Sequence, residues 1–287
     1  MILPKFDYVA PESLEEANRI LAETGTSARL MSGGTDVIVA MKEKTLTPSL
    51  IVDIKNIPGL NYLEYDPDEG LKIGALTTLR TIETSAFVKG NYPAVAQAAK
   101  YVASTQIRTK ATMTGNICNA SPSADTPPIL IALDTVLTVQ GPEGTRTVPV
   151  EQFYLGFKKV DLKPGEIVTQ IRIPAMKKGQ CAAYIKHAVR KAMDLAITGV
   201  AVSLMVEDGI CRNARIVLGA VAITPVRAPK AEQILIGQRI TDELIELAAS
   251  TAEGECQPIS DVRASAEYRK DMVRVFTKRA LKQALGQ

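Results

Sequence analysis

Two adjacent glycines occur in the segment Ser32-Gly33-Gly34-Thr35-Asp36, which follows a short apolar run at residues 28–31. Paired glycines let the backbone approach a ligand closely and turn its N–H groups inward. The apolar residues 37–41 are predicted to form a short helix, whose N-terminus would add N–H groups that suit a pyrophosphate. A plain tight turn is the alternative. The glycine spacing matches neither the Rossmann pattern nor the Walker loop.

A second segment, residues 112–128, is rich in small and hydrogen-bonding side chains and carries little charge. A polar loop this long among apolar segments must satisfy its hydrogen bonds somewhere, and wrapping a polar ligand would do so. Asp125 could then accept a hydrogen bond from a ribose hydroxyl. The alternative is a surface loop with a helix cap at Ser123 or Asp125.

The composition is that of an ordinary globular protein. The chain has 287 residues, 46% of them hydrophobic and 23% charged, and this length favours two domains over one. The net charge of +3 is too small to indicate a nucleic acid or a membrane surface as a partner, and there is no Trp to stack on single strands. No apolar run approaches the roughly 20 residues that span a bilayer.

The cysteines indicate a reducing compartment. They are scattered without C-x-x-C spacing, at Cys118, Cys181, Cys211 and Cys256. This pattern is typical of reduced cytoplasmic thiols and supplies no usual ligand set for zinc or an iron–sulfur cluster. Residues 1–7 do not have the pattern of a signal peptide. We therefore expect a cytoplasmic protein whose own cofactor, if it carries electrons, is organic.

Periodicity predicts the elements that position the two segments. Ser13 and Glu16 form a capping box, which predicts a helix over 14–21 with a stop at Gly25. Further helices are predicted at 37–41, 93–102 and 129–133, and Thr77 or Thr78 can cap another. Strands are predicted at 28–31, 50–54, 71–76, 136–139 and 167–173.

A domain boundary is predicted at 174–179, where Pro, Lys and Gly cluster. Beyond it, Asp208-Gly209 predicts a tight turn between the last two of three consecutive strands. Those strands are predicted at 182–190, 199–207 and 213–222, and helices at 226–236, 242–253 and 264–285. The fold class is therefore α+β, an α/β front region followed by a smaller α+β domain.

Several segments together resemble one protein family. SGGTDV at 32–37 and TGNICNASPSADTPP at 114–128 are similar to the FAD-binding medium subunits of molybdenum hydroxylases. That family includes the flavin components of xanthine dehydrogenases, nicotinate dehydrogenase and aerobic carbon monoxide dehydrogenase. The likeness extends over nearly the whole chain and includes residues 6–11, 73–78, 106–108 and 186–196. Several long motifs in the right order are far more specific than any one of them.

The resemblance implies an FAD-binding domain over residues 1–176, with two α/β subdomains at about 1–55 and 56–176, similar to the vanillyl-alcohol oxidase (PCMH-like) flavoproteins. It implies a C-terminal domain of the carbon monoxide dehydrogenase flavoprotein type over 177–287. The family form of this domain has a three-stranded antiparallel sheet and helices.

The resemblance also implies which residues bind FAD. Backbone N–H groups of residues 30–37 would hold the pyrophosphate, and Asp125 would hold the adenosine ribose. A lysine near the flavin ring, Lys186, would favour an anionic reduced form. The cofactor-binding residues carried over in full are Leu30, Met31, Ser32, Gly33, Gly34, Thr35, Asp36, Val37, Val102, Thr112, Thr114, Gly115, Asn116, Asn119, Asp125, Val168 and Lys186. No catalytic residue and no metal ligand is expected on this chain.

By the same resemblance, the chain would be an electron-transfer component and not a complete enzyme. A large subunit with the molybdopterin cofactor would oxidise the substrate, and a small subunit with [2Fe-2S] clusters would pass the electrons to FAD on this chain. NAD⁺ or another acceptor would take them up. No nucleic-acid partner and no membrane span are expected.

Two other functions are considered: a self-contained FAD oxidase of the vanillyl-alcohol oxidase fold, and a flavin-free scaffold subunit. The first would need its own cap domain and substrate pocket, and intact Gly33, Gly34, Asn116 and Asp125 count against the second. Within the family, the form of the second segment points toward the xanthine dehydrogenase branch. His187, the single histidine, is interpreted as structural and Cys118 as a packing residue. The substrate of the complex, its acceptor and its stoichiometry are not indicated.

Overall fold

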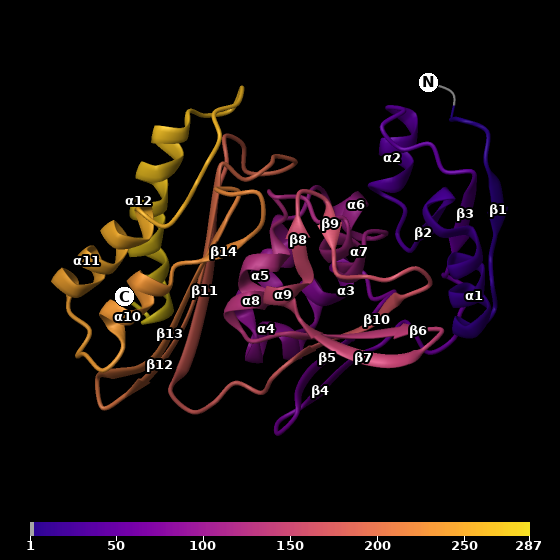
Figure 1. Ribbon diagram of the computed structural model, residues 1–287. Coiled ribbons are helices and arrows are strands. Elements are labelled where there is room, and N and C mark those ends of the chain that lie inside the picture. The colour runs from indigo at the N-terminus through magenta and orange to yellow at the C-terminus, as the bar shows by residue number, and fades with distance from the viewer. Residues whose placement is uncertain (1–2) are drawn as a thin grey trace.

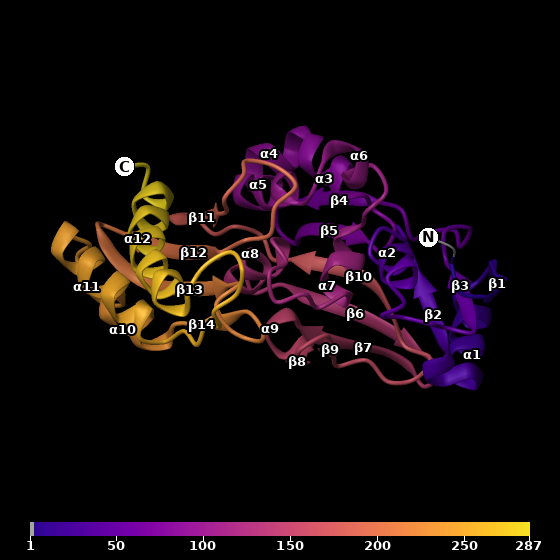
Figure 2. The same ribbon diagram turned by 90° about the horizontal axis from the view of Figure 1, so that it is seen from above.

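The structure, a computed structural model, describes residues 3–287. Three regions lie in a row: a small N-terminal sheet, a five-stranded sheet with its helices, and a C-terminal sheet covered by the last helices (Figure 1, Figure 2). The two ends of the chain lie at opposite ends of this row (Figure 2). No helix in the described range is both long enough and apolar enough to cross a membrane.

The N-terminal sheet is parallel, with the order β1-β3-β2. Helix α1 (Leu14–Thr24) begins after Ser13, whose hydroxyl accepts a hydrogen bond from the Glu16 amide, so the predicted N-terminal cap is confirmed. The other elements are β1 (Asp7–Val9), η1 (Gly25–Ser27), β2 (Ala28–Met31), α2 (Val37–Lys42) and β3 (Leu50–Asp53). The segment Ser32–Asp36 therefore leaves the carboxyl end of β2 and leads into α2.

The middle sheet is antiparallel, with the order β4-β5-β10-β6-β7. Its strands are β4 (Leu63–Asp66), β5 (Gly70–Gly74), β6 (Val136–Gly141), β7 (Gly144–Pro149) and β10 (Ile167–Ile173). The helices of this region are α3 (Leu79–Thr84), α4 (Ala86–Asn91), α5 (Pro93–Tyr101), α6 (Thr105–Arg108), α7 (Met113–Cys118), α8 (Thr126–Ala132) and α9 (Val150–Phe153). A two-stranded hairpin, β8 (Tyr154–Gly156) and β9 (Lys159–Val160), follows α9.

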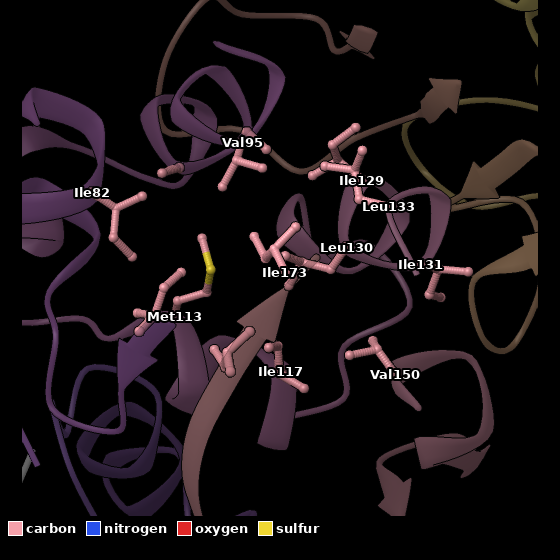
Figure 3. Packing of buried hydrophobic residues seen from close by; sticks show 14 of the residues in the cluster. Ile82, Val95, Met113, Ile117, Ile129, Leu130, Ile131, Leu133, Val150 and Ile173 are labelled. Atoms are coloured by element: carbon pink, nitrogen blue, oxygen red, sulfur yellow. The ribbon is translucent and has the colours of Figure 1, made fainter. Parts of the chain in front are cut away.

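The core of the middle region joins these helices to the sheet. Figure 3 shows Ile82 of α3, Val95 of α5 and Met113 of α7 converging on Ile173 of β10, and all four side chains are buried. Burying one such side chain stabilises the fold by about 1.5–3 kcal/mol. This packing holds α7, and with it the second polar segment, in place.

The C-terminal sheet is antiparallel, with the order β11-β12-β13-β14. Helices α10 (Pro229–Leu235) and α12 (Ala266–Ala284) contact one face, and α11 (Asp242–Glu253) packs on both helices. Along β12, Val200 and Val202 belong to the core under these helices, whereas Ala201 belongs to the core of the middle region. The strands are β11 (Gln180–His187), β12 (Thr198–Glu207), β13 (Ile210–Gly219) and β14 (Val226–Arg227). The sheet is thus buried on both faces.

The prediction of a three-stranded C-terminal sheet is wrong by one strand. Val226 and Arg227, predicted to begin a helix, form β14 and pair with Leu218 and Val217 of β13. The helix begins only at Pro229. The residue before a proline is disfavoured in the α conformation, whereas proline itself suits the first helical position.

Other elements also differ from the sequence prediction, among them β4, which was not predicted, and β11 and β13, which begin and end two or three residues earlier than predicted. β7 was not predicted, because Val148 is the one buried residue of this strand and no apolar alternation shows. The second polar segment is not one continuous loop, since its first part is helix α7, capped by the Thr112 hydroxyl. By contrast, the predicted strand 167–173 and helix 242–253 coincide with β10 and α11.

Candidate functional site

A cavity of about 1100 Å³ lies where the β2–α2 loop, α7 and the loop after it, the β9–β10 loop and the β11–β12 loop meet. Pockets that bind small molecules and cofactors have volumes of about 300–1000 Å³. This cavity is at the upper end of that range, so it is large enough for a large cofactor such as a dinucleotide.

Most of the residues predicted to bind FAD line this cavity. They are Leu30, Ser32, Gly33, Gly34, Thr35, Asp36, Val37, Val102, Thr112, Thr114, Gly115, Asn116, Asn119, Asp125 and Val168. Met31 and Lys186 do not line it. The Met31 side chain lies against Gly34, where an added Cβ would be 3.1 Å from the Met31 sulfur.

The two polar segments touch each other at the cavity wall. The Ser32 hydroxyl lies 3.1 Å from the Thr112 hydroxyl, within hydrogen-bond distance. The Thr112 hydroxyl also accepts a hydrogen bond from the Gly115 amide at 2.9 Å. A Cβ on Gly115 would stand 2.9 Å from that same Thr112 oxygen, so a larger residue there would displace the hydroxyl that joins the segments.

Gly33 and Gly34 have different roles. A Cβ on Gly33 would lie 2.2 Å from the Lys110 carbonyl oxygen, so this glycine permits direct backbone contact between the two loops. Gly34 has φ +73°, in the left-handed region that favours glycine. The first glycine thus brings the loops together, and the second turns the chain.

The cavity wall contains hydrogen-bond donors without protein partners. Among residues 3–287, the backbone amides of Gly33, Gly34 and Thr35 have no acceptor. Buried polar groups are normally satisfied, so these donors point to a ligand with several acceptors, which a pyrophosphate provides. The side-chain oxygen of Asn116 accepts from Thr126 at 2.7 Å, which leaves its amide group for a ligand.

Asp125 is buried and forms an ion pair with Lys186 of β11, at 2.8 Å. Its other oxygen accepts a hydrogen bond from the Tyr184 hydroxyl at 3.1 Å. Burial raises the pKa of Asp125 to about 6, although the Lys186 ammonium acts in the opposite direction. Lys186 also donates to the carbonyls of Tyr101 (3.2 Å) and Asp194 (2.8 Å). The Lys186 ammonium is therefore engaged by protein acceptors beside the cavity, not within it.

Sequence reasoning missed several parts of the wall. Residues 162–166 of the β9–β10 loop and Ile167 at the start of β10 line the cavity, as do Ala103 and the β11–β12 loop residues Met193, Asp194 and Leu195. The only signal for the β9–β10 loop was a Pro164-Gly165 turn, in which Gly165 has φ +82°. Residues 193–195 fall within a segment that carries the family resemblance, but nothing in the segment itself indicates a cavity.

His187 and Cys118, interpreted from the sequence as a structural and a packing residue, lie in different places. The His187 ring stacks on Phe276 at 4.8 Å and its Nε2 lies 3.1 Å from the Tyr268 hydroxyl, outside the cavity. Cys118 lines the cavity, and burial raises the pKa of its thiol to about 12, so the thiol is protonated at neutral pH. Within residues 3–287, no group of three or more His, Cys, Asp or Glu side chains is arranged to hold a metal ion.

Comparisons with known proteins agree with this geometry. Residues 4–176 match the family model described as the FAD binding domain in molybdopterin dehydrogenase, and residues 183–284 match the CO dehydrogenase flavoprotein C-terminal domain. The carbon monoxide dehydrogenase medium chain of Hydrogenophaga pseudoflava is 35% identical over 99% of this chain and 98% of the relative. The xanthine dehydrogenase FAD-binding subunit of Escherichia coli O157:H7 is 32% identical, over 97% and 96%.

Among solved structures, a carbon monoxide dehydrogenase from Hydrogenophaga pseudoflava that lacks the Mo-pyranopterin moiety of its cofactor superposes with a TM-score of 0.96. It is 35% identical and covers 100% of this chain and 99% of that chain. The chain belongs to the FAD-binding medium subunits of the molybdopterin hydroxylase family. It is an oxidoreductase subunit of carbon monoxide dehydrogenase and xanthine dehydrogenase type. Identities of 35% and 32% do not separate these two branches, so the assignment to the xanthine dehydrogenase branch stays a prediction.

Gly33→Ala tests the backbone contact between the loops. The added Cβ meets the Lys110 carbonyl, so we expect the free energy of unfolding to fall by about 1–3 kcal/mol. Gly90→Ala is the matched control, because its Cβ meets nothing within 4 Å in helix α4, and there alanine should stabilise by about 0.5–1 kcal/mol. Urea unfolding of the apoprotein measures both. Equal effects of the two substitutions would contradict the contact.

Lys186→Met tests the buried ion pair. At pH 8 the Asp125 carboxylate keeps its hydrogen bond from Tyr184 but has lost its cation, and we expect a loss of about 3–5 kcal/mol. The loss should be smaller at pH 5, because the pKa of Asp125 is raised to about 6 with Lys186 present and rises further without it. The folded variant then takes up a proton, so its stability falls as pH increases from about 4 through that raised pKa. Urea unfolding at both pH values checks this.

The double variant Asp125→Asn/Lys186→Met supplies the control. With neither charge buried, it should lose less stability than the sum of the two single variants and should lack the added pH dependence. Strict additivity of the two single losses would mean that the pair is not coupled.

Proposed function

We propose that this chain is the FAD-binding electron-transfer subunit of a multi-subunit molybdenum hydroxylase. In this proposal it accepts electrons from the [2Fe-2S] clusters of a small partner subunit and passes them to an acceptor such as NAD⁺. The observation that supports it is the cavity of about 1100 Å³, where two glycine-containing segments meet and the first presents unpartnered amides. The family match supports the same proposal.

In the proposed complex, each group of residues holds one part of FAD. The amides of Gly33, Gly34 and Thr35 would bind the pyrophosphate, together with the side-chain amide group of Asn116. Asp125 would accept a hydrogen bond from the adenosine ribose. Its oxygens already accept from Tyr184 and Lys186, but each carboxylate oxygen has a second lone pair.

Bound FAD can take up electrons singly and release them as a pair, which suits a position between iron–sulfur clusters and a hydride acceptor. The chain itself binds and orients the cofactor and shields it from water. Substrate oxidation would occur on a molybdenum-binding large subunit that carries the molybdopterin cofactor. The solved carbon monoxide dehydrogenase from Hydrogenophaga pseudoflava, which lacks the Mo-pyranopterin moiety of its molybdenum cofactor, supports this division of labour.

We further infer that the chain divides into an FAD-binding domain at 1–176 and a C-terminal domain at 177–287. The first would have subdomains at about 1–55 and 56–176 and would be of the vanillyl-alcohol oxidase (PCMH-like) type. The separate N-terminal sheet and five-stranded sheet support the two subdomains. The family-model ranges 4–176 and 183–284 support the main division.

Gly34→Leu tests the cofactor site. We expect the purified wild-type chain to be yellow and to release FAD identifiable by mass, and the variant to bind no added FAD. Gly59→Leu is the matched control, because Gly59 has a similar φ, +75° against +73°, and a Cβ there meets nothing within 4 Å. It carries the same backbone strain outside the cavity wall. A colourless wild-type chain that also fails to bind added FAD would contradict the proposal and support a flavin-free scaffold subunit.

A second test separates electron transfer from substrate oxidation. The FAD-loaded chain alone should transfer electrons from NADH to a dye acceptor, because electron transfer between a bound flavin and small molecules needs no other subunit. It should not hydroxylate a purine, because it lacks the molybdenum centre. Spectrophotometric dye reduction and product analysis measure the two activities, and Gly34→Leu provides the flavin-free blank. Purine turnover by this chain alone would contradict the proposal.

A further inference from the structure

The turn that follows helix α5 forms part of the cavity wall and has a strained backbone. Helix α5 ends at Tyr101, and the next two residues, Val102 and Ala103, line the cavity. Ala103 has φ +46°, in the left-handed region that a residue with a Cβ occupies only at a cost in free energy. Surrounding contacts must therefore hold this turn in place.

Two buried cations hold the turn through three consecutive carbonyl groups. The Arg108 Nη1 group donates to the Val102 carbonyl at 2.9 Å and to the Ala103 carbonyl at 3.4 Å. The Lys186 ammonium donates to the Tyr101 carbonyl at 3.2 Å. Cations at the end of a helix also interact favourably with its dipole.

The guanidinium of Arg108 is itself fixed on every side. Its Nε donates to Glu83 at 2.9 Å, and its Nη2 donates to Glu83 at 3.4 Å and to the Thr105 hydroxyl at 3.2 Å. With the two bonds from Nη1, each of the five N–H donors of an arginine has an acceptor. Arg108 and Glu83 are 6% and 8% exposed, so this network is not free to rearrange. A lysine cannot reproduce a planar fork with five donors.

We propose that Arg108 is a positioning residue for the dinucleotide: with Glu83 holding its guanidinium, it fixes the left-handed turn at Val102–Ala103 against which the cofactor packs. Arg108 does not line the cavity and acts through the turn. The inference rests on the proposed function, because it requires that the cavity binds FAD. A residue that only stabilised the fold would affect every ligand of the cavity alike. A residue that positions one wall affects the part of the dinucleotide that touches that wall.

The test measures dissociation constants of the full-length apoprotein for FAD, ADP and FMN by calorimetry. The two smaller ligands represent the two halves of FAD. Arg108→Lys should weaken FAD binding by about tenfold or more, and should weaken one of the two half-ligands much more than the other. The visible circular dichroism of bound FAD should also change, because this signal depends on the surroundings of the ring system.

Two companion variants make the result specific. Arg80→Ala is the control, because Arg80 pairs with the same Glu83 at 3.1 Å from an exposed position and does not touch the turn. Its dissociation constant for FAD should stay within about twofold of wild type. Ala103→Gly removes the cost of the left-handed turn, so Arg108→Lys/Ala103→Gly should bind FAD more tightly than Arg108→Lys alone.

Unchanged FAD binding by Arg108→Lys would overturn the inference. So would an equal loss of ADP and FMN binding that follows the loss of thermal stability, or the absence of any recovery in the double variant. If the wild-type chain binds FAD while these results fail, the proposed function stands and only the role of Arg108 is lost. A wild-type chain that binds no FAD contradicts both.

Discussion

The cavity depends on two loops, distant in the sequence, that are held backbone against backbone. Gly33 lies against the Lys110 carbonyl, where no larger residue fits, and the Ser32 and Thr112 hydroxyls meet beside it. Because of this contact, the β2–α2 loop and the start of α7 border the same space. The free N–H groups of the β2–α2 loop are thus oriented before any ligand arrives. A site arranged in advance loses less conformational freedom on binding.

The buried charges around the cavity are paired with one another. The two buried cations nearby are each paired with a carboxylate, Lys186 with Asp125 and Arg108 with Glu83. Their remaining donors go mainly to backbone carbonyls, so they hold chain segments and contribute little net positive charge. An unpaired charge would be costly at this depth, which makes the pairing a condition for burying these groups. In the proposed function, a diphosphate would be recognised by the backbone amides of the β2–α2 loop, and Arg29 and Lys163 are the basic residues that line the cavity.

Much of this arrangement could be predicted from the sequence, and the remainder has a common physical reason. Long periodic elements such as β10 and α11 were predicted correctly, since their pattern is local. The two-residue strand β14 and the mostly exposed β7 carry no such pattern. Both glycines of the first segment were predicted to bind the ligand. The clash that Gly33 avoids is instead with the Lys110 carbonyl, and nothing in the sequence indicates that Lys110 lies beside it. Arg108 was part of a recognised motif, yet its partner Glu83 lies 25 residues earlier.

The placement of Lys186 shows why the C-terminal region belongs to the cavity. Its ammonium binds Asp125 of the loop before α8, the Tyr101 carbonyl at the end of α5 and the Asp194 carbonyl of the β11–β12 loop. These three segments all border the cavity, and one cation holds them together. The sheet that carries Lys186 is buried on both faces, so the region cannot withdraw without exposing apolar core. The front region and the C-terminal region therefore both shape the cavity, and a change where they contact each other would alter the cavity wall.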